Sequence, residues 1–130
     1  MVIGNATVKQ WSRTQKRIAI STQEAELYAC SHTAQEALGI KAYASGLGQD
    51  HEVCVRVDSA AALSLVHREG LGKAKHVDIE HLWVQPTQSN GKLKYEKVHT
   101  HYKSADLMTK ATSAERMIML MNAMGYSYHE

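Results

Sequence analysis

An aspartate at the end of a predicted apolar strand is the strongest single candidate for a functional side chain in this sequence. Residues 53–57 are rich in valine, Asp58 follows them, and an alanine-rich stretch that favours a helix comes next. In α/β folds, side chains just beyond the carboxyl ends of strands line the crevice where sites form. Aspartate is also favoured at helix N-termini, so Asp58 has two interpretations, a helix cap or a site carboxylate.

Two further acids occupy comparable places in the chain. Glu26 lies in the first turn of a long predicted helix, and Asp106 lies in the first turn of a later one. Helices packed on a sheet can bring such positions to one end of it, together with Asp58. Clustered carboxylates need a cation to neutralise them, and oxygen ligands favour Mg²⁺ or Mn²⁺, which in pairs support phosphodiester cleavage. The alternative is three unrelated surface acids.

The elements that must position these acids begin with a predicted β-hairpin. Its strands are expected at 2–11 and 17–20, with a polar turn at 12–16. Ser21 and Glu24 then form a capping box, which predicts a helix as far as about Ser45. Glycines at 46 and 48 are expected to end that helix.

Strands and helices alternate in the rest of the chain. We expect a strand ending at Asp58, helices at 59–68, 73–84, 104–110 and 113–124, and a half-buried strand at 92–99. The methionines of the last helix are expected to fill a core.

Composition indicates an ordinary folded domain. The chain has 130 residues, is 44% hydrophobic and 22% charged, and carries a formal net charge of +2. We expect one domain over residues 1–130, without a signal peptide or a membrane-spanning segment. Cys30 and Cys54 are predicted to be buried thiols in a reducing, intracellular compartment rather than a disulfide. The mild positive charge permits a polyanionic partner without requiring one.

Four motifs carry a family resemblance. Residues 15–26 resemble the Q-K-x-x-A-x-S-x-x-E-A-E signature of the ribonuclease H domain in copia-type retrotransposon polyproteins. Residues 57–63 resemble its strand-end D-(N/S)-x-(S/A)-A segment. Residues 75–79 resemble its K-H-I-D-I motif, and residues 105–110 resemble its A-D-x-x-T-K motif. The motifs occur in the family's order.

The resemblance implies a fold and a reaction. The fold is the ribonuclease H-like α/β fold, a mixed five-stranded sheet flanked by helices. The reaction is hydrolysis of the RNA strand of RNA–DNA hybrids with two divalent metals, Mg²⁺ or Mn²⁺, held by four acids. Glu26, Asp58 and Asp106 match three of these acids. The resemblance also implies that the chain begins after the family's first strand, so that this strand and its fourth acid are absent and metal binding is weakened.

Basic residues near the N-terminus are candidates for nucleic-acid binding. Lys9, Arg13, Lys16 and Arg17 cluster on the predicted hairpin beside Trp11. Such an edge can follow phosphates, and an RNA–DNA hybrid would be recognised by its shape and 2′-hydroxyls. A solvated hairpin face is the alternative.

Histidines offer weaker candidates. His101 lies before Asp106, where the resemblance implies an accessory role in product release. His99 and His101 have a zinc-compatible spacing, but no cysteine accompanies them.

Three functions therefore remain open. The first is an active ribonuclease H domain, attached in life to upstream reverse transcriptase and integrase domains of a parent polyprotein. The second is a catalytically inactive, truncated remnant that binds nucleic acid. The third is a small α/β interaction domain whose acids are only caps. The oligomeric state is open in each case.

Overall fold

Two compact units make up the part of the chain that the structure describes. The structure is a computed structural model that describes residues 1–15, 18–72, 77, 79–108 and 110–127. Residues 15–97 form one unit, here called the central unit, and residues 1–14 with 98–130 form the other, the terminal unit. A single domain over residues 1–130 remains a prediction.

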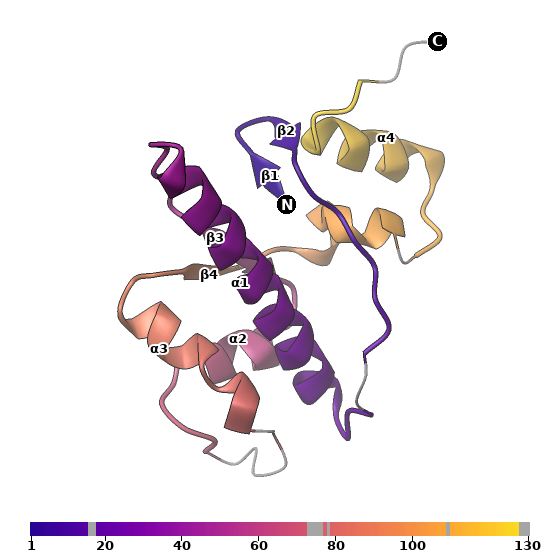
Figure 1. Cartoon of the computed structure of the whole chain (residues 1–130). Coiled ribbons are helices and arrows are strands. Elements are labelled where there is room, and N and C mark those ends of the chain that lie inside the picture. Colours follow the sequence, from indigo (N-terminus) through magenta and orange to yellow (C-terminus); the bar gives the residue numbers. More distant parts are fainter. Residues whose placement is uncertain (16–17, 73–76, 78, 109, 128–130) are drawn as a thin grey trace. The chain divides into compact units, whose positions relative to one another are not determined.

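A long helix dominates the central unit. Figure 1 shows this helix, α1 (Thr22–Gly46), crossing the strand pair of the unit. The other elements are β3 (Cys54–Val57), α2 (Ala60–Val66), the 3₁₀ helix η1 (Ile79–His81), α3 (Val84–Ser89) and β4 (Lys94–Lys97).

Local signals at both ends of α1 explain its bounds. The Ser21 hydroxyl accepts from the amide of Glu24, and the carboxylate of Glu24 accepts from the amide of Ile20, 2.6 Å away. This is a capping box in which the Glu24 carboxylate accepts from the amide of Ile20 instead of the amide of Ser21. At the other end Gly48 has a φ of +75° and its amide donates to Ser45, which closes the helix as predicted.

The core of the central unit lies where α1, α2 and α3 pack on two parallel strands. β3 pairs with β4 in parallel, with Val55 opposite Tyr95. Val55 and Val57 point inward, while Cys54 and Arg56 are exposed. Cys54 is therefore not the buried thiol that the sequence predicted, whereas Cys30 is buried, and both are free. Four fully buried side chains of the core are those of Leu27, Leu65, Val84 and Leu93.

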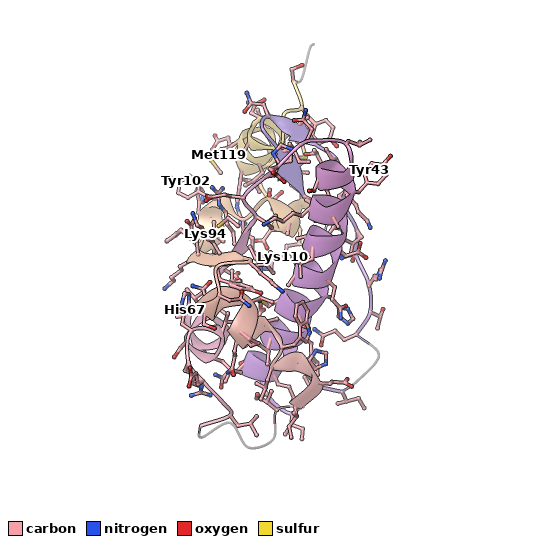
Figure 2. All side chains as sticks on the ribbon, turned by 60° about the vertical axis from the view of Figure 1, so that its left-hand side comes forward. Tyr43, His67, Lys94, Tyr102, Lys110 and Met119 are labelled. Carbon is pink, nitrogen blue, oxygen red and sulfur yellow. The ribbon has the colours of Figure 1, made fainter. Side chains whose placement is uncertain are left out.

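Burial decreases toward the C-terminal end of α1. Leu27 and Ala34 have no exposed surface, but Tyr43 is 71% exposed, and Figure 2 shows its side chain projecting outward. The buried residues of α1 lie between Glu24 and Ala37, so the first part of the helix anchors it in the core.

The terminal unit contains a shorter hairpin than the sequence predicted. β1 (Val2–Ile3) pairs with β2 (Ala6–Thr7) in an antiparallel ladder. The chain reverses at Gly4 and Asn5, where Gly4 has a φ of +58°, as glycine-led hairpin turns require. Predicted strands at 2–11 and 17–20 with a turn at 12–16 are therefore wrong within the described residues, because the glycine allows an earlier turn.

Two 3₁₀ helices and one α-helix complete the terminal unit. η2 (Thr100–Tyr102) and η3 (Ser104–Met108) lead to α4 (Ala114–Ala123), which Ser113 caps as predicted. The hydroxyl of Thr7 donates to the Met124 carbonyl, 2.7 Å away, and so ties the hairpin to the end of α4. Met124 is buried but Met117 is 41% exposed, so the methionines fill the core only in part.

The fold class agrees with the sequence at the coarser level. The chain is mixed α/β, with small sheets flanked by helices. The described residues form two two-stranded sheets, β1–β2 and β3–β4, rather than the five-stranded sheet that the resemblance implies. Among the described helices, none combines the length and apolar character needed to cross a bilayer.

Candidate functional site

Asp58 lies at the tip of a buried strand, directly after β3. The side chain that caps α2 is that of Ser59, whose hydroxyl accepts from the amide of Ala62, 3.2 Å away. The cap interpretation of Asp58 is therefore wrong, because its neighbour fills that role. Asp58 is half-buried at the strand end, which leaves the site interpretation of this carboxylate standing.

Glu26 lies at the same end of the central unit. The Gln23 side-chain amide in the first turn of α1 donates to the carbonyl of Ala61 in the first turn of α2, 3.0 Å away. This bond holds the starts of the two helices together. Glu26 follows Gln23 by three residues, and Asp58 precedes Ala61 by three, so both acids belong to the region that this bond fixes.

The negative charge of Glu26 affects the buried thiol of Cys30. Burial, and after it the negative charge of Glu26, raises the pKa of the Cys30 thiol to about 12. Cys30 therefore stays a neutral thiol near neutral pH. The site end of α1 thus presents carboxylate oxygen rather than thiolate sulfur.

Asp106 lies in the terminal unit, on η3, and is almost fully buried. Its Oδ2 accepts from the Arg116 guanidinium at 2.8 Å, and its Oδ1 lies 3.2 Å from the Lys110 ammonium. Burial by itself would raise the pKa of Asp106, but the hydrogen bonds from Arg116 and Lys110 outweigh it and hold that pKa below its usual value. Asp106 is thus an ionised carboxylate with a basic partner on each oxygen.

The positions of Glu26, Asp58 and Asp106 determine which of these acids could share a metal ion. Within the described residues, no group of three or more histidine, cysteine, aspartate or glutamate side chains could hold a metal ion. Glu26 and Asp58 do share one end of the central unit. A pair of carboxylates suits Mg²⁺, which is often bound through one or two protein carboxylates with water and substrate phosphates completing its shell. For Asp106, a metal would have to displace Arg116 or Lys110.

The predicted basic cluster is described only in part. Lys16 and Arg17 lie outside the described residues, as does most of the segment 75–79. Lys9 is half-buried with its ammonium 5.6 Å from the centre of the Trp11 ring, an arrangement typical of a cation–π contact. Arg13 is exposed, and both residues lie on the segment after β2 rather than on the hairpin.

His101 lies on η2 rather than on a strand. Its amide donates to Nδ1 of His99, 3.2 Å away, and its carbonyl accepts from Arg116. This local turn replaces the strand face on which the zinc-compatible spacing depended. The accessory role of His101 stays a prediction.

Sequence reasoning missed a pocket in the central unit. It has a volume of about 350 Å³, and its lining includes Tyr28 and His32 of α1, His81 of η1, and Trp83. Four aromatic rings within 56 residues carried no joint signal, because His32 and His81, whose rings meet in the fold, are 49 positions apart in the sequence. The one available sign was the number of histidines, which is eight.

Comparison with known proteins places the chain beside a transposon polyprotein. No protein-family model matches the chain, and no solved structure matches it. A retrovirus-related Pol polyprotein from transposon TNT 1-94 of Nicotiana tabacum is 29% identical over 116 residues, which is 88% of this chain. The chain spans 9% of the length of that polyprotein. This similarity supports an origin in a retrotransposon polyprotein.

Proposed function

We propose that the chain is a ribonuclease H-type domain that hydrolyses the RNA strand of RNA–DNA hybrids during retrotransposon reverse transcription. The observation that carries the proposal is the Gln23–Ala61 hydrogen bond, which joins the starts of α1 and α2 beside Glu26 and Asp58, in a chain similar to a transposon Pol polyprotein. The four motifs in family order add to it. The parent polyprotein would supply reverse transcriptase and integrase domains.

The three acids would act as metal ligands in this reaction. Glu26 and Asp58 would hold Mg²⁺ or Mn²⁺ through their carboxylate oxygens, with Asp106 as the third family acid. The bound cations would supply activation of water and stabilisation of the leaving oxygen. Lys9 and Arg13 would contact backbone phosphates, which position a hybrid without reading its sequence.

A second candidate is a nucleic-acid-binding domain that does not cleave. The observation that favours it is the pairing of both Asp106 oxygens with Arg116 and Lys110, which makes this acid part of a salt-bridge network. A carboxylate held by two cationic side chains is less available to a metal. Binding would then rest on Lys9 and Arg13 and would weaken with salt.

One assay separates the two candidates. A hybrid with a labelled RNA strand is incubated with the chain and Mg²⁺ or Mn²⁺, beside the variants Asp58→Asn and Glu26→Gln. The nuclease proposal expects cleavage that each variant lowers at least about 100-fold, since losing a ligand should cost at least as much as losing a partner outside the ligand shell. The exposed acids Asp50 and Glu69 provide the matched controls Asp50→Asn and Glu69→Gln, which should cleave like the parent.

The other outcomes are equally informative. Cleavage that Asp58→Asn leaves unchanged would refute the proposed site. Salt-dependent binding of the hybrid without cleavage, in either metal, would favour the second candidate. Absence of both binding and cleavage would leave only the interaction-domain interpretation.

A further inference from the structure

The pocket of the central unit is lined by residues that the proposed metal site does not use, although both draw on α1. It lies where the middle of α1 faces η1 and the residue just before α3, and its volume is about 350 Å³. Ligand pockets range from about 300 to 1,000 Å³, so this one suits a small planar group. The side chains that matter for its chemistry are Tyr28, His32, Gln35, Glu80, His81 and Trp83.

Fixed aromatic rings form its walls. The Tyr28 ring lies 4.2 Å from the His81 ring, centre to centre, at an interplanar angle of 41°. The Tyr28 hydroxyl donates to the buried carboxylate of Glu24, and the Trp83 indole donates to the Ser31 hydroxyl, 2.9 Å away. These bonds hold both rings before any ligand arrives, which lowers the entropic cost of binding.

Polar side chains on the rim determine what the pocket would accept. His32 and Gln35 are exposed, and a glutamine amide both donates and accepts hydrogen bonds. Glu80 is also exposed and brings a carboxylate, while none of the described lining residues is lysine or arginine. The Glu80 carboxylate lies 3.5 Å from the His81 imidazole, and the described lining holds no permanently charged cation, which disfavours a phosphate and favours a neutral ring with N–H donors.

We propose that this pocket binds one unstacked nucleobase of a single-stranded nucleic acid. Single-strand recognition commonly places splayed-out bases on tyrosine, tryptophan or histidine rings, with hydrogen bonds to the base edge. Glu80 favours bases with an exocyclic amino group, so adenine, cytosine and guanine should bind better than uracil or thymine. The proposal rests on the proposed function only in taking nucleic acid as the partner, and it requires neither cleavage nor metal.

Trp83 provides a fluorescence signal inside the pocket. The chain has two tryptophans, so a Trp11→Phe variant leaves Trp83 as the only one. This variant is titrated with five-nucleotide homopolymers of adenine, cytosine and thymine, in EDTA so that no cleavage can occur. A five-unit abasic strand with the same phosphates is the backbone control. We expect saturable quenching with the adenine and cytosine strands, weaker quenching with thymine, and none with the abasic strand.

Two exposed rim positions test the pocket without disturbing the core. His32→Ala and Gln35→Ala, each added to Trp11→Phe, should weaken binding of the adenine strand at least about fivefold. The matched controls are His67→Ala, at the end of α2 and labelled in Figure 2, and Gln49→Ala after α1, which should bind like their parent.

Three results would overturn the proposal. They are equal quenching by the abasic strand, no saturable quenching by any strand, and unchanged affinity in both rim variants. Because the titration contains no divalent metal, its failure leaves the hybrid-cleavage result unaffected. Loss of cleavage in Asp58→Asn would likewise leave base binding unaffected.

Discussion

Residues that are close in sequence and similar in chemistry have different surroundings in this chain. Asp58 and Ser59 are adjacent, yet the serine caps α2 and the aspartate lies at the strand tip. Glu24 lies in the first turn of α1 and Glu26 two residues later, but Glu24 is buried and bonded to Ile20 and Tyr28. Residue type alone left these roles open, and the hydrogen bonds assign the structural roles of Ser59 and Glu24.

Asp106 makes a prediction about acid stability. Its pKa in the folded protein lies below the unfolded value, so its ionised form stabilises the fold above pH about 4 and loses that effect as the pH falls. We expect Asp106→Asn to lower the free energy of unfolding at pH 7 by about 1.5–3 kcal/mol, the usual worth of hydrogen bonds to charged groups. The difference between parent and variant should shrink between pH 5 and pH 2, roughly the range in which such a carboxylate titrates.

Denaturant unfolding followed at several pH values checks this expectation. Glu115→Gln, which changes an exposed acid of α4, is the control and should behave like the parent. The titration of such a carboxylate ends at roughly pH 2. If the difference in unfolding free energy between the parent and Asp106→Asn stayed constant down to that pH, the charge of Asp106 would not be what stabilises the fold.

At the scale of elements, local signals predicted the bounds of α1, whereas the helix expected at 73–84 is wrong within the described residues, which hold the 3₁₀ helix η1 and only the first residue of α3. The helix predicted from Ser21 to about Ser45 is α1 (Thr22–Gly46), because its cap and its glycines act within a few residues. The hairpin was wrong because Gly4 was taken as part of a strand, although it provides the turn. The approach of α1 to α2 depends on a bond between residues 38 positions apart, which no local pattern encodes.

The cap of α2 gives a stability prediction for this element. Ser59→Ala should lower the free energy of unfolding by about 1 kcal/mol, because the Ala62 amide loses its side-chain partner. Ser64→Ala, an exposed position on the same helix, is the matched control and should cost nothing. Thermal or denaturant unfolding measures both, and equal stabilities would mean that Ser59 is not the effective cap.

The division of the whole molecule into two units was not predicted from the sequence. The motifs predicted Glu26, Asp58 and Asp106 as site acids, and this stays a prediction. Glu26 and Asp58 each lie three residues from a partner in the Gln23–Ala61 hydrogen bond, which joins α1 to α2 in the central unit. Asp106 belongs to the terminal unit and its ion-pair network. Division into two units arises from contacts between residues far apart in sequence, so neither composition nor periodicity reports it.

The affinity of the chain for a divalent metal reports on Glu26 and Asp58 without requiring substrate or turnover. Mn²⁺ binding is measured by water-proton relaxation on the parent, Asp58→Asn, Glu26→Gln and the control Asp50→Asn. The account predicts that the first two variants each bind Mn²⁺ at least about tenfold more weakly than the parent and the control. Equal Mn²⁺ affinity in all four proteins would contradict it.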